Sequence, residues 1–345
     1  MLAAIALVLF SPHHQHPSFF YAGGDPSEIP EVEAAGGVYR VHGKPVDPLL
    51  AMKQAGWTAV RLRVWNDPSA HAHFCDLPHT LAMAKRIKSA GLKLMIDFHY
   101  SDWWADPGKQ NKPEAWTKLN LQDLTKAVHD YSRDVVKALA DQDTPADVVQ
   151  PGNEVTNGFL WPDARLNING DGWPAFMQIE KAAIAGIREG AGEHRPKIMI
   201  HIDQGGRSNI SRFWFDNYFK RGGECDLIGL SYYPFWHGTL RELRSNLQSL
   251  AHRYHKPVIV AETAFAYQTW RKEKSPVPGF DETPAGQAGY LRRLTSVVKS
   301  GGGAGVLWWA PAWISTPGQH GGWGRLTLFN SQTGEALPAF FAFAK

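Results

Sequence analysis

The sequence predicts an α/β fold, namely a single-domain (β/α)8 TIM barrel. Eight short apolar or β-branched runs alternate with longer helical patterns along almost the whole chain. This alternation predicts a parallel sheet, and eight strands are the number that closes such a barrel. The chain has 345 residues, which suits one barrel, because barrels of about 250 residues and more form a single domain.

The individual elements follow from local patterns. Short apolar runs bounded by turn residues indicate buried strands, whereas apolar positions spaced by three or four residues, as in residues 121–140, indicate helices. Glycines directly after two of the helices are typical C-cap signals. The expected strands are Phe19–Gly23, Ala59–Val64, Lys93–Phe98, Asp147–Gln150, Lys197–Ile202, Leu227–Ser231, Pro257–Val260 and Gly305–Trp309. The expected helices are Pro48–Ala55, Leu77–Ala90, Leu121–Ala140, Trp173–Glu189, Ile210–Lys220, Leu240–Tyr254 and Pro284–Lys299.

A doubly wound sheet is the weaker alternative. No G-x-G-x-x-G motif follows the first strand, and the triplet Gly301-Gly302-Gly303 precedes the eighth strand, where it indicates a turn. The sequence has no internal repeat and no linker that divides it. We therefore expect one domain over residues 19–345.

Residues 1–18 are expected to be a signal or leader segment. The apolar stretch Leu2–Phe10 is too short to span a bilayer but has the length of a signal-peptide core. This predicts a secreted or periplasmic protein. In such a compartment Cys75 and Cys225 could form a disulfide, and two separate buried thiols are the alternative.

The composition is that of a soluble globular protein, with 43% hydrophobic and 20% charged residues. The net charge of +3 comes without a Lys/Arg run, which argues against nucleic-acid binding. We also expect no membrane partner and a monomeric state. The 14 tryptophans suggest aromatic platforms for sugar rings, although a tryptophan-rich core would need them too.

Two glutamates stand at the ends of apolar strands. Glu154 follows the run Val149-Gln150-Pro151-Gly152-Asn153, and Glu262 follows Val258-Ile259-Val260-Ala261. In a barrel, the C-terminal ends of the strands carry the catalytic groups. Two carboxylates facing each other there are what glycoside cleavage by an acid/base and a nucleophile requires. Taken singly, each could instead be a helix-capping or salt-bridged residue.

Further polar residues occupy the other strand ends. Arg61 would share a face with Arg63, and an inward arginine next to a carboxylate is expected to lower its pKa. A structural ion pair is the alternative for such an arginine. The residues Asp97, His99, His201 and Asp203 could in principle hold a catalytic metal. However, the H-x-H pair typical of metal-dependent barrel hydrolases is absent from the first strand, so no metal and no cofactor are expected.

Several segments resemble the endo-β-1,4-galactanases, which are the family 53 glycoside hydrolases. The resemblance extends from about Gly23 to the C-terminus, and the DFHYSDxWADP motif is its most specific part. The matching segments are Arg61–Pro68, Asp97–Pro107, Gly152–Glu154, Phe159–Pro162, Ser231–Gly238 and Pro311–Ile314.

The resemblance implies a retaining, endo-acting enzyme that cleaves β-1,4-galactosidic bonds in galactan and type I arabinogalactan. Glu154 would be the general acid/base and Glu262 the nucleophile. Their carboxyl groups would lie about 5–5.5 Å apart, whereas roughly 6.5 Å or more would indicate inversion. Another member of the same clan, such as a β-mannanase or cellulase, remains an alternative, and so does a non-catalytic galactan-binding barrel.

The resemblance also implies a set of substrate-binding residues. Asn153 would contact the sugar 2-hydroxyl, Arg61 and Tyr233 would orient the nucleophile, and Trp309 would form the floor under the cleaved sugar. The full set is Arg61, His99, Asn153, Tyr233, Trp309, Trp104, Asp106 and Trp161.

Two features of the family are missing. Family members usually carry a glutamate at the position of Ala310, so the loop after the eighth strand is expected to differ. Some bacterial members bind a structural calcium ion through a late acidic loop, and no comparable cluster occurs between Thr263 and Pro284.

Overall fold

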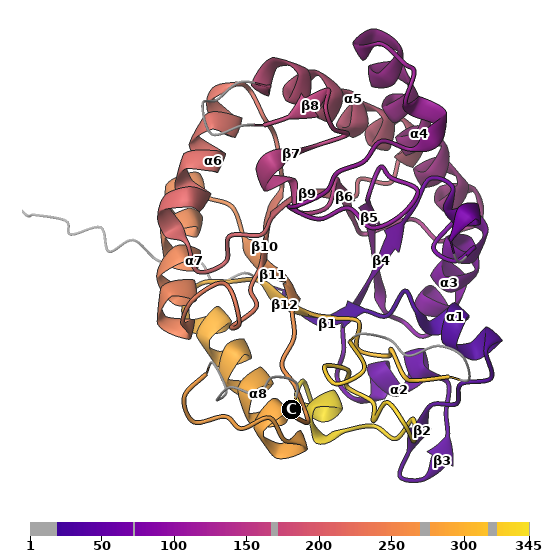
Figure 1. Cartoon of the computed structure of the whole chain (residues 1–345), viewed down its shortest axis with the longest axis vertical. Helices are drawn as coiled ribbons and strands as arrows, with labels where there is room; N and C mark the ends of the chain where they lie inside the picture. The colour runs from indigo at the N-terminus through magenta and orange to yellow at the C-terminus, as the bar shows by residue number, and fades with distance from the viewer. Residues whose placement is uncertain (1–18, 72, 167–171, 270–276, 317–322, 345) are drawn as a thin grey trace, which may run out of the picture.

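The computed structural model describes residues 19–71, 73–166, 172–269, 277–316 and 323–344. Eight parallel strands form a closed barrel in the order β1-β12-β11-β10-β9-β6-β5-β4 (Figure 1). The prediction of a single (β/α)8 barrel is therefore confirmed. The strands are β1 (Tyr21–Asp25), β4 (Ala59–Val64), β5 (Lys93–Phe98), β6 (Val148–Pro151), β9 (Lys197–Ile202), β10 (Leu227–Ser231), β11 (Val258–Thr263) and β12 (Gly305–Trp309).

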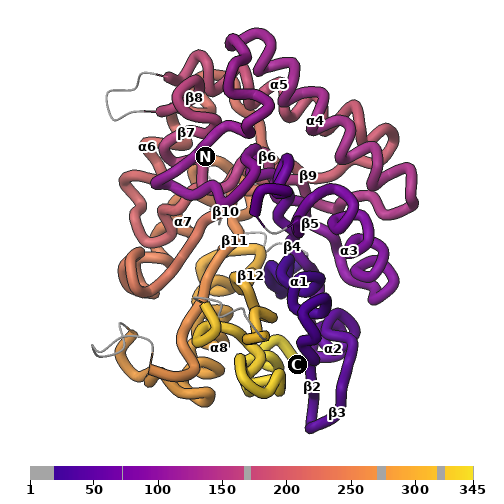
Figure 2. The backbone as a smooth tube through the Cα atoms, turned by 45° about the vertical axis from the view of Figure 1, so that its right-hand side comes forward, coloured from indigo at the N-terminus to yellow at the C-terminus, as the bar shows by residue number. Residues whose placement is uncertain are grey.

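Helices surround the barrel on its outer side, as Figures 1 and 2 show. Short hairpins, β2 (Arg40–Val41) with β3 (Lys44–Pro45) and β7 (Gly158–Phe159) with β8 (Ala164–Arg165), interrupt the alternation. The helices are α1 (Ile29–Ala34), α2 (Pro48–Gln54), α3 (Leu77–Ser89), α4 (Leu121–Asp141), α5 (Trp173–Ala191), α6 (Ser208–Lys220), α7 (Leu240–Tyr254) and α8 (Pro284–Ser300).

Several element boundaries differ from the prediction by one or two residues, as in β1, which begins at Tyr21 and not at Phe19. Three differences are informative. β11 continues from the expected end at Val260 to Thr263, so Glu262 lies within a strand and not after it. β6 is shifted by one residue and ends at Pro151. Helix α1 was not predicted, because its six residues are too few to show a helical period.

The apolar residues form two layers. One cluster fills the inside of the barrel and includes Met95, Met199 and Leu307. The larger cluster lies between the sheet and the helices. Helix α5 approaches α4 closely through Gly186 and Gly190, where a Cβ atom would come within 2.1 and 2.2 Å of backbone oxygens of α4. Only glycine fits at such a contact.

The chain after β12 runs from the C-terminal end of the barrel strands back to their N-terminal end, where it contacts the residues just before β4. Its short helix η4 (Pro338–Phe341) packs beside α8. The indole of Trp57, just before β4, donates to the Phe340 carbonyl at 3.1 Å. Figure 2 shows the C-terminus between α8 and α2. The predicted leader lies outside the described residues. Cys75 and Cys225 are separate buried thiols and not a disulfide. No helix in the described parts of the chain is long and apolar enough to cross a membrane.

Candidate active site

The backbone turns sharply after β6 to present Glu154. Gly152 and Glu154 both have positive φ angles, of 96° and 47°. The left-handed conformation is unfavourable for a residue with a side chain and is maintained only where the surroundings enforce it. The turn directs Glu154 into a cavity of about 610 Å³ at the C-terminal end of the barrel.

A bulge in β11 sets the position of the second glutamate. The β10–β11 register shifts between Leu230 and Ser231, so that Ser231 faces Glu262. The register with β12 shifts in the same stretch. β-bulges redirect side chains next to active sites, and here the extra residue brings Glu262 to the wall of the same cavity.

Glu262 is held at both carboxylate oxygens. Arg61 donates to Oε1 at 3.0 Å, and the Tyr233 hydroxyl donates to Oε2 at 3.0 Å. Glu262 is 4% exposed and Tyr233 5% exposed. The charge-assisted hydrogen bond from Arg61 and the buried hydrogen bond from Tyr233 together fix the orientation of the Glu262 carboxylate.

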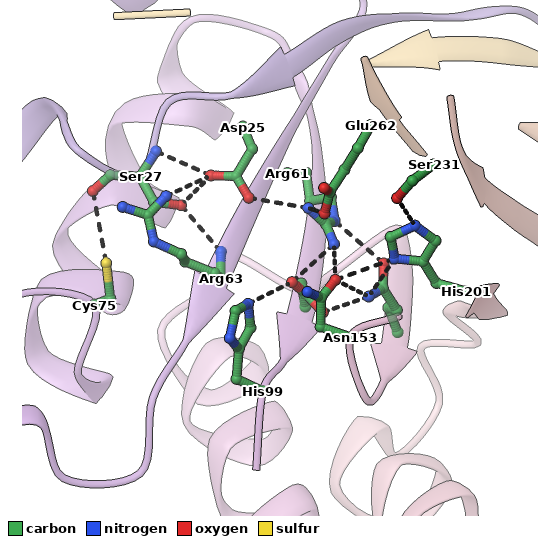
Figure 3. Close-up of polar contacts among 12 residues, drawn as sticks. Asp25, Ser27, Arg61, Arg63, Cys75, His99, Asn153, His201, Ser231 and Glu262 are labelled. Atoms are coloured by element: carbon green, nitrogen blue, oxygen red, sulfur yellow. Dashed lines mark hydrogen bonds and ion pairs between the residues drawn. The ribbon is translucent and has the colours of Figure 1, made fainter. Parts of the chain in front are cut away.

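Arg61 is a fully buried cation that neutralises several carboxylates at once. Besides Glu262, it contacts Asp97 at 2.8 Å and Asp25 at 3.2 Å. It also donates to the side-chain oxygens of Gln150 at 3.1 Å and Asn153 at 2.9 Å (Figure 3). The guanidinium, on β4, thus joins groups from four other strands or their ends, β1, β5, β6 and β11.

The pKa values of the two glutamates are both raised, which corrects the expectation of a lowered pKa at Glu262. Burial raises the pKa of Glu262 to about 7, and Arg61 and Tyr233 act against that rise. The pKa of Glu154 is raised well above its ordinary value, by burial first and then by the charges of Glu262 and Asp203. Burial exceeds the effect of the arginine because the site is removed from water. Arg61 and Tyr233 favour the ionised form of Glu262.

Aromatic rings line one side of the cavity. Trp309 meets Trp104 edge to face at 5.7 Å, and Trp104 stacks on Trp313 at 6.2 Å. The buried guanidinium of Arg63 lies 4.6 Å from the ring of Trp104 and 5.4 Å from that of Trp309. Such cation–π contacts hold the indole rings in a fixed orientation.

The loop after β12 is well anchored around Ala310, where the resemblance led us to expect a glutamate. Ala310 is buried with a positive φ of 48°. Two residues later, the Ala312 N–H donates to Glu28 at 2.8 Å, and the Ala312 carbonyl accepts from the Tyr39 hydroxyl at 2.8 Å. These contacts support the loop that carries Trp313.

Most of the predicted residues meet at the cavity. The ones that line it are His99, Trp104, Asp106, Asn153, Glu154, Tyr233, Glu262 and Trp309. Arg61 lies behind the wall and acts through Glu262 and Asn153. Both ring nitrogens of His99 are engaged, because Nδ1 accepts from the Ala105 N–H at 3.0 Å and Nε2 lies 3.1 Å from Asp97.

Trp161 does not line the cavity. Its indole packs against Arg165 at 4.2 Å and donates to the Asn157 carbonyl at 2.9 Å. The residue therefore supports the loop after β6. The aromatic pattern alone could not separate this role from substrate contact.

Several lining residues were not assigned to the site from sequence. Asp203 was visible as a strand-end residue, but the others lie in loops whose course the pattern does not determine. These residues are Lys109, Asp203, Arg207, Trp236, His237, Trp313 and Trp323. The bulge in β11 and the roles of Gln150 and Ser231 behind the wall were also not predicted.

The metal alternative finds no support in the geometry. Asp97 pairs with Arg61, whereas His201 contacts Ser231 at 2.9 Å. Asp203 accepts a hydrogen bond from Thr156. Among the residues placed in the structure, no group of three or more His, Cys, Asp or Glu side chains could hold a metal ion.

A (β/α)8 barrel with two buried glutamates, an arginine at one of them and a tryptophan wall is typical of glycoside hydrolases. The model of glycosyl hydrolase family 53 matches residues 21–343. The chain belongs to this family.

Relatives and solved structures agree with this membership. The chain is similar to an arabinogalactan endo-β-1,4-galactanase of Cellvibrio japonicus, with 35% identity over 94% of this chain and 90% of the relative. The family 53 catalytic domain of Ignisphaera aggregans has a TM-score of 0.86 at 34% identity, covering 95% of this chain and 97% of that one. A fungal β-1,4-galactanase structure has a TM-score of 0.85 at 30% identity, covering 94% and 99%.

Proposed function

We propose that this chain hydrolyses β-1,4-galactosidic bonds inside galactan, including the backbone of type I arabinogalactan. The observation that supports this most directly is the pair Glu154 and Glu262 on the wall of one cavity within a chain of family 53. Relatives and structures of similar length bear galactanase names. Galactan is therefore the substrate that fits both the site and its relatives.

The proposed mechanism is a double displacement with net retention. Glu262, ionised and oriented by Arg61 and Tyr233, attacks the anomeric carbon. Glu154, whose raised pKa keeps it protonated, gives its proton to the leaving oxygen. The galactosyl–Glu262 ester is then hydrolysed by water, from which Glu154 removes a proton. The Trp309 ring would lie under the sugar at the cleavage point.

Replacement of either glutamate tests these roles. E262A should abolish release of reducing ends from linear galactan, because no covalent intermediate can form. E154A should lose about 10²- to 10⁴-fold in rate on galactan. On a dinitrophenyl β-1,4-galactobioside, whose leaving group needs no acid, azide should restore its activity, because azide attacks the galactosyl ester without needing a base. The matched control is E242A, at an exposed residue of α7. Substantial galactan cleavage by E262A would contradict the assignment.

The stereochemical outcome tests the mechanism separately. NMR of early products from galactan should show the β-anomer first, because two inversions at the anomeric carbon restore its configuration. An initial α-anomer would mean that Glu262 acts as a base on water and forms no ester.

The alternative substrates are separated by an assay on three polymers. A β-mannanase or cellulase would release reducing sugar from mannan or cellulose in preference to galactan. A non-catalytic barrel would bind galactan, as seen by calorimetry, without shortening it. The presence of both glutamates on the wall of one cavity argues against a non-catalytic barrel.

Secretion or a periplasmic location and a monomeric state are also part of the proposal. A polymeric substrate is encountered outside the cytoplasm, which agrees with a leader at residues 1–18. Mass spectrometry of the N-terminus of the exported protein and light scattering in solution would test these points.

A further inference from the structure

Two buried polar side chains extend the hydrogen bonding from Glu154 away from the cavity. Ser231, the last residue of β10, donates to Oε1 of Glu154. The Ser231 Oγ also lies 2.9 Å from Nε2 of His201 in β9 (Figure 3). Both residues have no measurable exposure, and neither is among the described residues that line the cavity. Substrate therefore does not reach them directly.

The second nitrogen of His201 has a donor beside it. Its Nδ1 lies 3.2 Å from Nε2 of Gln150 and 3.1 Å from Oδ1 of Asn153. Arg61 fixes both amides, because it donates to Oε1 of Gln150 and to Oδ1 of Asn153. The Gln150 amide nitrogen also donates to Asp97 Oδ1 and, at 3.0 Å, to the Gly152 carbonyl. The ring proton is placed by Ser231, whose single hydroxyl proton goes to Glu154. The ring nitrogen beside that hydroxyl, Nε2, is then the one that donates.

The imidazole stays uncharged. Burial lowers the pKa of His201 well below its ordinary value, and the nearby charge of Arg61 acts in the same direction. A neutral ring with its proton on Nε2 donates to Ser231, and the hydroxyl proton of Ser231 then points to Glu154. An ionised carboxylate is also a better acceptor for that proton than a neutral ring nitrogen.

We propose that His201 and Ser231 are positioning residues that keep Oε1 of Glu154 a hydrogen-bond acceptor throughout the reaction and confine the transferable proton to Oε2. This rests on the proposed role of Glu154 as acid/base. With Oε1 occupied by Ser231 before and after proton transfer, the proton leaves from and returns to the same oxygen. The chain needs no rearrangement between the two steps, which is the advantage of a preorganised site.

The same bond limits how strongly Glu154 holds its proton. Burial, Glu262 on β11 and Asp203 after β9 raise the pKa of Glu154, and Ser231 and Arg61 on β4 lower it. Tyr233 and His237, which follow β10, also line the cavity. Removal of the Ser231 hydroxyl therefore takes away one of the two groups that oppose the rise.

The variant S231A tests the inference through its pH dependence. The alkaline limb of kcat/KM on galactan should move up by about one pH unit, the size expected for one hydrogen bond to a charged group. At neutral pH, kcat should fall on the order of tenfold. With a dinitrophenyl β-1,4-galactobioside, whose leaving group needs no acid, kcat/KM should remain within about twofold of wild type. The variant S231T keeps the hydroxyl and should restore the limb, with thermal unfolding as the check that both variants fold.

The tautomer of His201 is a second measurement that does not depend on turnover. Nitrogen-15 NMR, assigned by comparison with H201N, should show an uncharged ring with its proton on Nε2 from pH 5 to pH 9. A proton on Nδ1, or an unchanged alkaline limb in S231A, would overturn the inference. Failure of the proposed function would look different, because E154Q would then cleave galactan at an undiminished rate whatever the tautomer.

Discussion

Arg61 shows at the residue scale how one buried cation organises the site. It contacts Asp25, Asp97 and Glu262, all with side chains that are at most 6% exposed. Buried carboxylates are tolerated only when they are paired and hydrogen-bonded. A planar guanidinium with five donors can serve all of them at once, which a lysine ammonium cannot.

The variant R61K is therefore expected to lose both stability and activity. Lysine keeps the charge but cannot reach all three carboxylates, so the free energy of unfolding should fall by about 3 kcal/mol and kcat/KM on galactan by at least about 100-fold. Urea unfolding and initial rates would measure the two effects. The control is R86K, because Arg86 also pairs with two carboxylates, Glu33 and Asp47, but is a third exposed. That change should cost less than about 1 kcal/mol.

At the scale of elements, helices α5 and α6 meet around a buried glutamate. Glu180 of α5 is 1% exposed and accepts a hydrogen bond from the Tyr218 hydroxyl of α6. Burial raises the pKa of Glu180 to about 7. The folded protein therefore binds this proton more tightly than the unfolded chain does. The resulting stabilisation is complete below the unfolded pKa of 4.5 and is lost as the pH rises through about 7.

Wild-type protein should accordingly become less stable between pH 5 and pH 8. E180Q should make this decline shallower, and the part that remains comes from the other buried carboxyl groups with raised pKa values, Glu28, Glu154 and Glu262. At pH 8 the variant should be more stable than wild type by roughly 2 kcal/mol, since glutamine fills the same space without a charge. Urea unfolding at a series of pH values is the measurement. E189Q, on an exposed part of the same helix, should leave the profile unchanged. If the free energy of unfolding of E180Q declined with pH as steeply as that of wild type, a group other than Glu180 would be responsible.

At the scale of the whole molecule, the barrel could be predicted because eight short, apolar and bounded strands alternate with seven helical patterns. From their places at the predicted strand ends, Glu154 and Glu262 could be expected at one mouth of the barrel, and both line the same cavity. The bulge that positions Glu262 could not be predicted, because a one-residue register shift depends on the neighbouring strands and leaves no local pattern. The raised pKa of Glu262 also escaped prediction, since it reflects burial, which a linear sequence does not measure.

The C-terminal segment secures the far end of the barrel, so F340A should destabilise the whole fold without changing the site. Phe340 is fully buried and packs on Phe329 and Trp57 with ring centroids 4.8 and 5.8 Å apart. Its truncation should lower the free energy of unfolding by about 3–5 kcal/mol, while kcat/KM at 25 °C stays near wild type. Thermal unfolding and kinetics would check both. The control F213A, at a 59% exposed position, should change neither quantity. If F340A loosened only the C-terminal segment and left the global unfolding transition unshifted, the view that the barrel and this segment form one cooperative unit would be contradicted.

The pairing of β1 with β12 also has a consequence for the timing of synthesis. β1 begins at Tyr21 and its partner strand begins at Gly305, a separation of 305 − 21 = 284 residues. At about 5–20 residues per second, translation of that interval takes roughly 15 to 60 s. During this time the first strand lacks one of its two neighbours, and ring closure waits for almost the last part of the polypeptide to emerge. A nascent chain that cannot complete its barrel early stays incompletely folded, and an incompletely folded chain is the form that can pass through a translocation pore, as the proposed export would require.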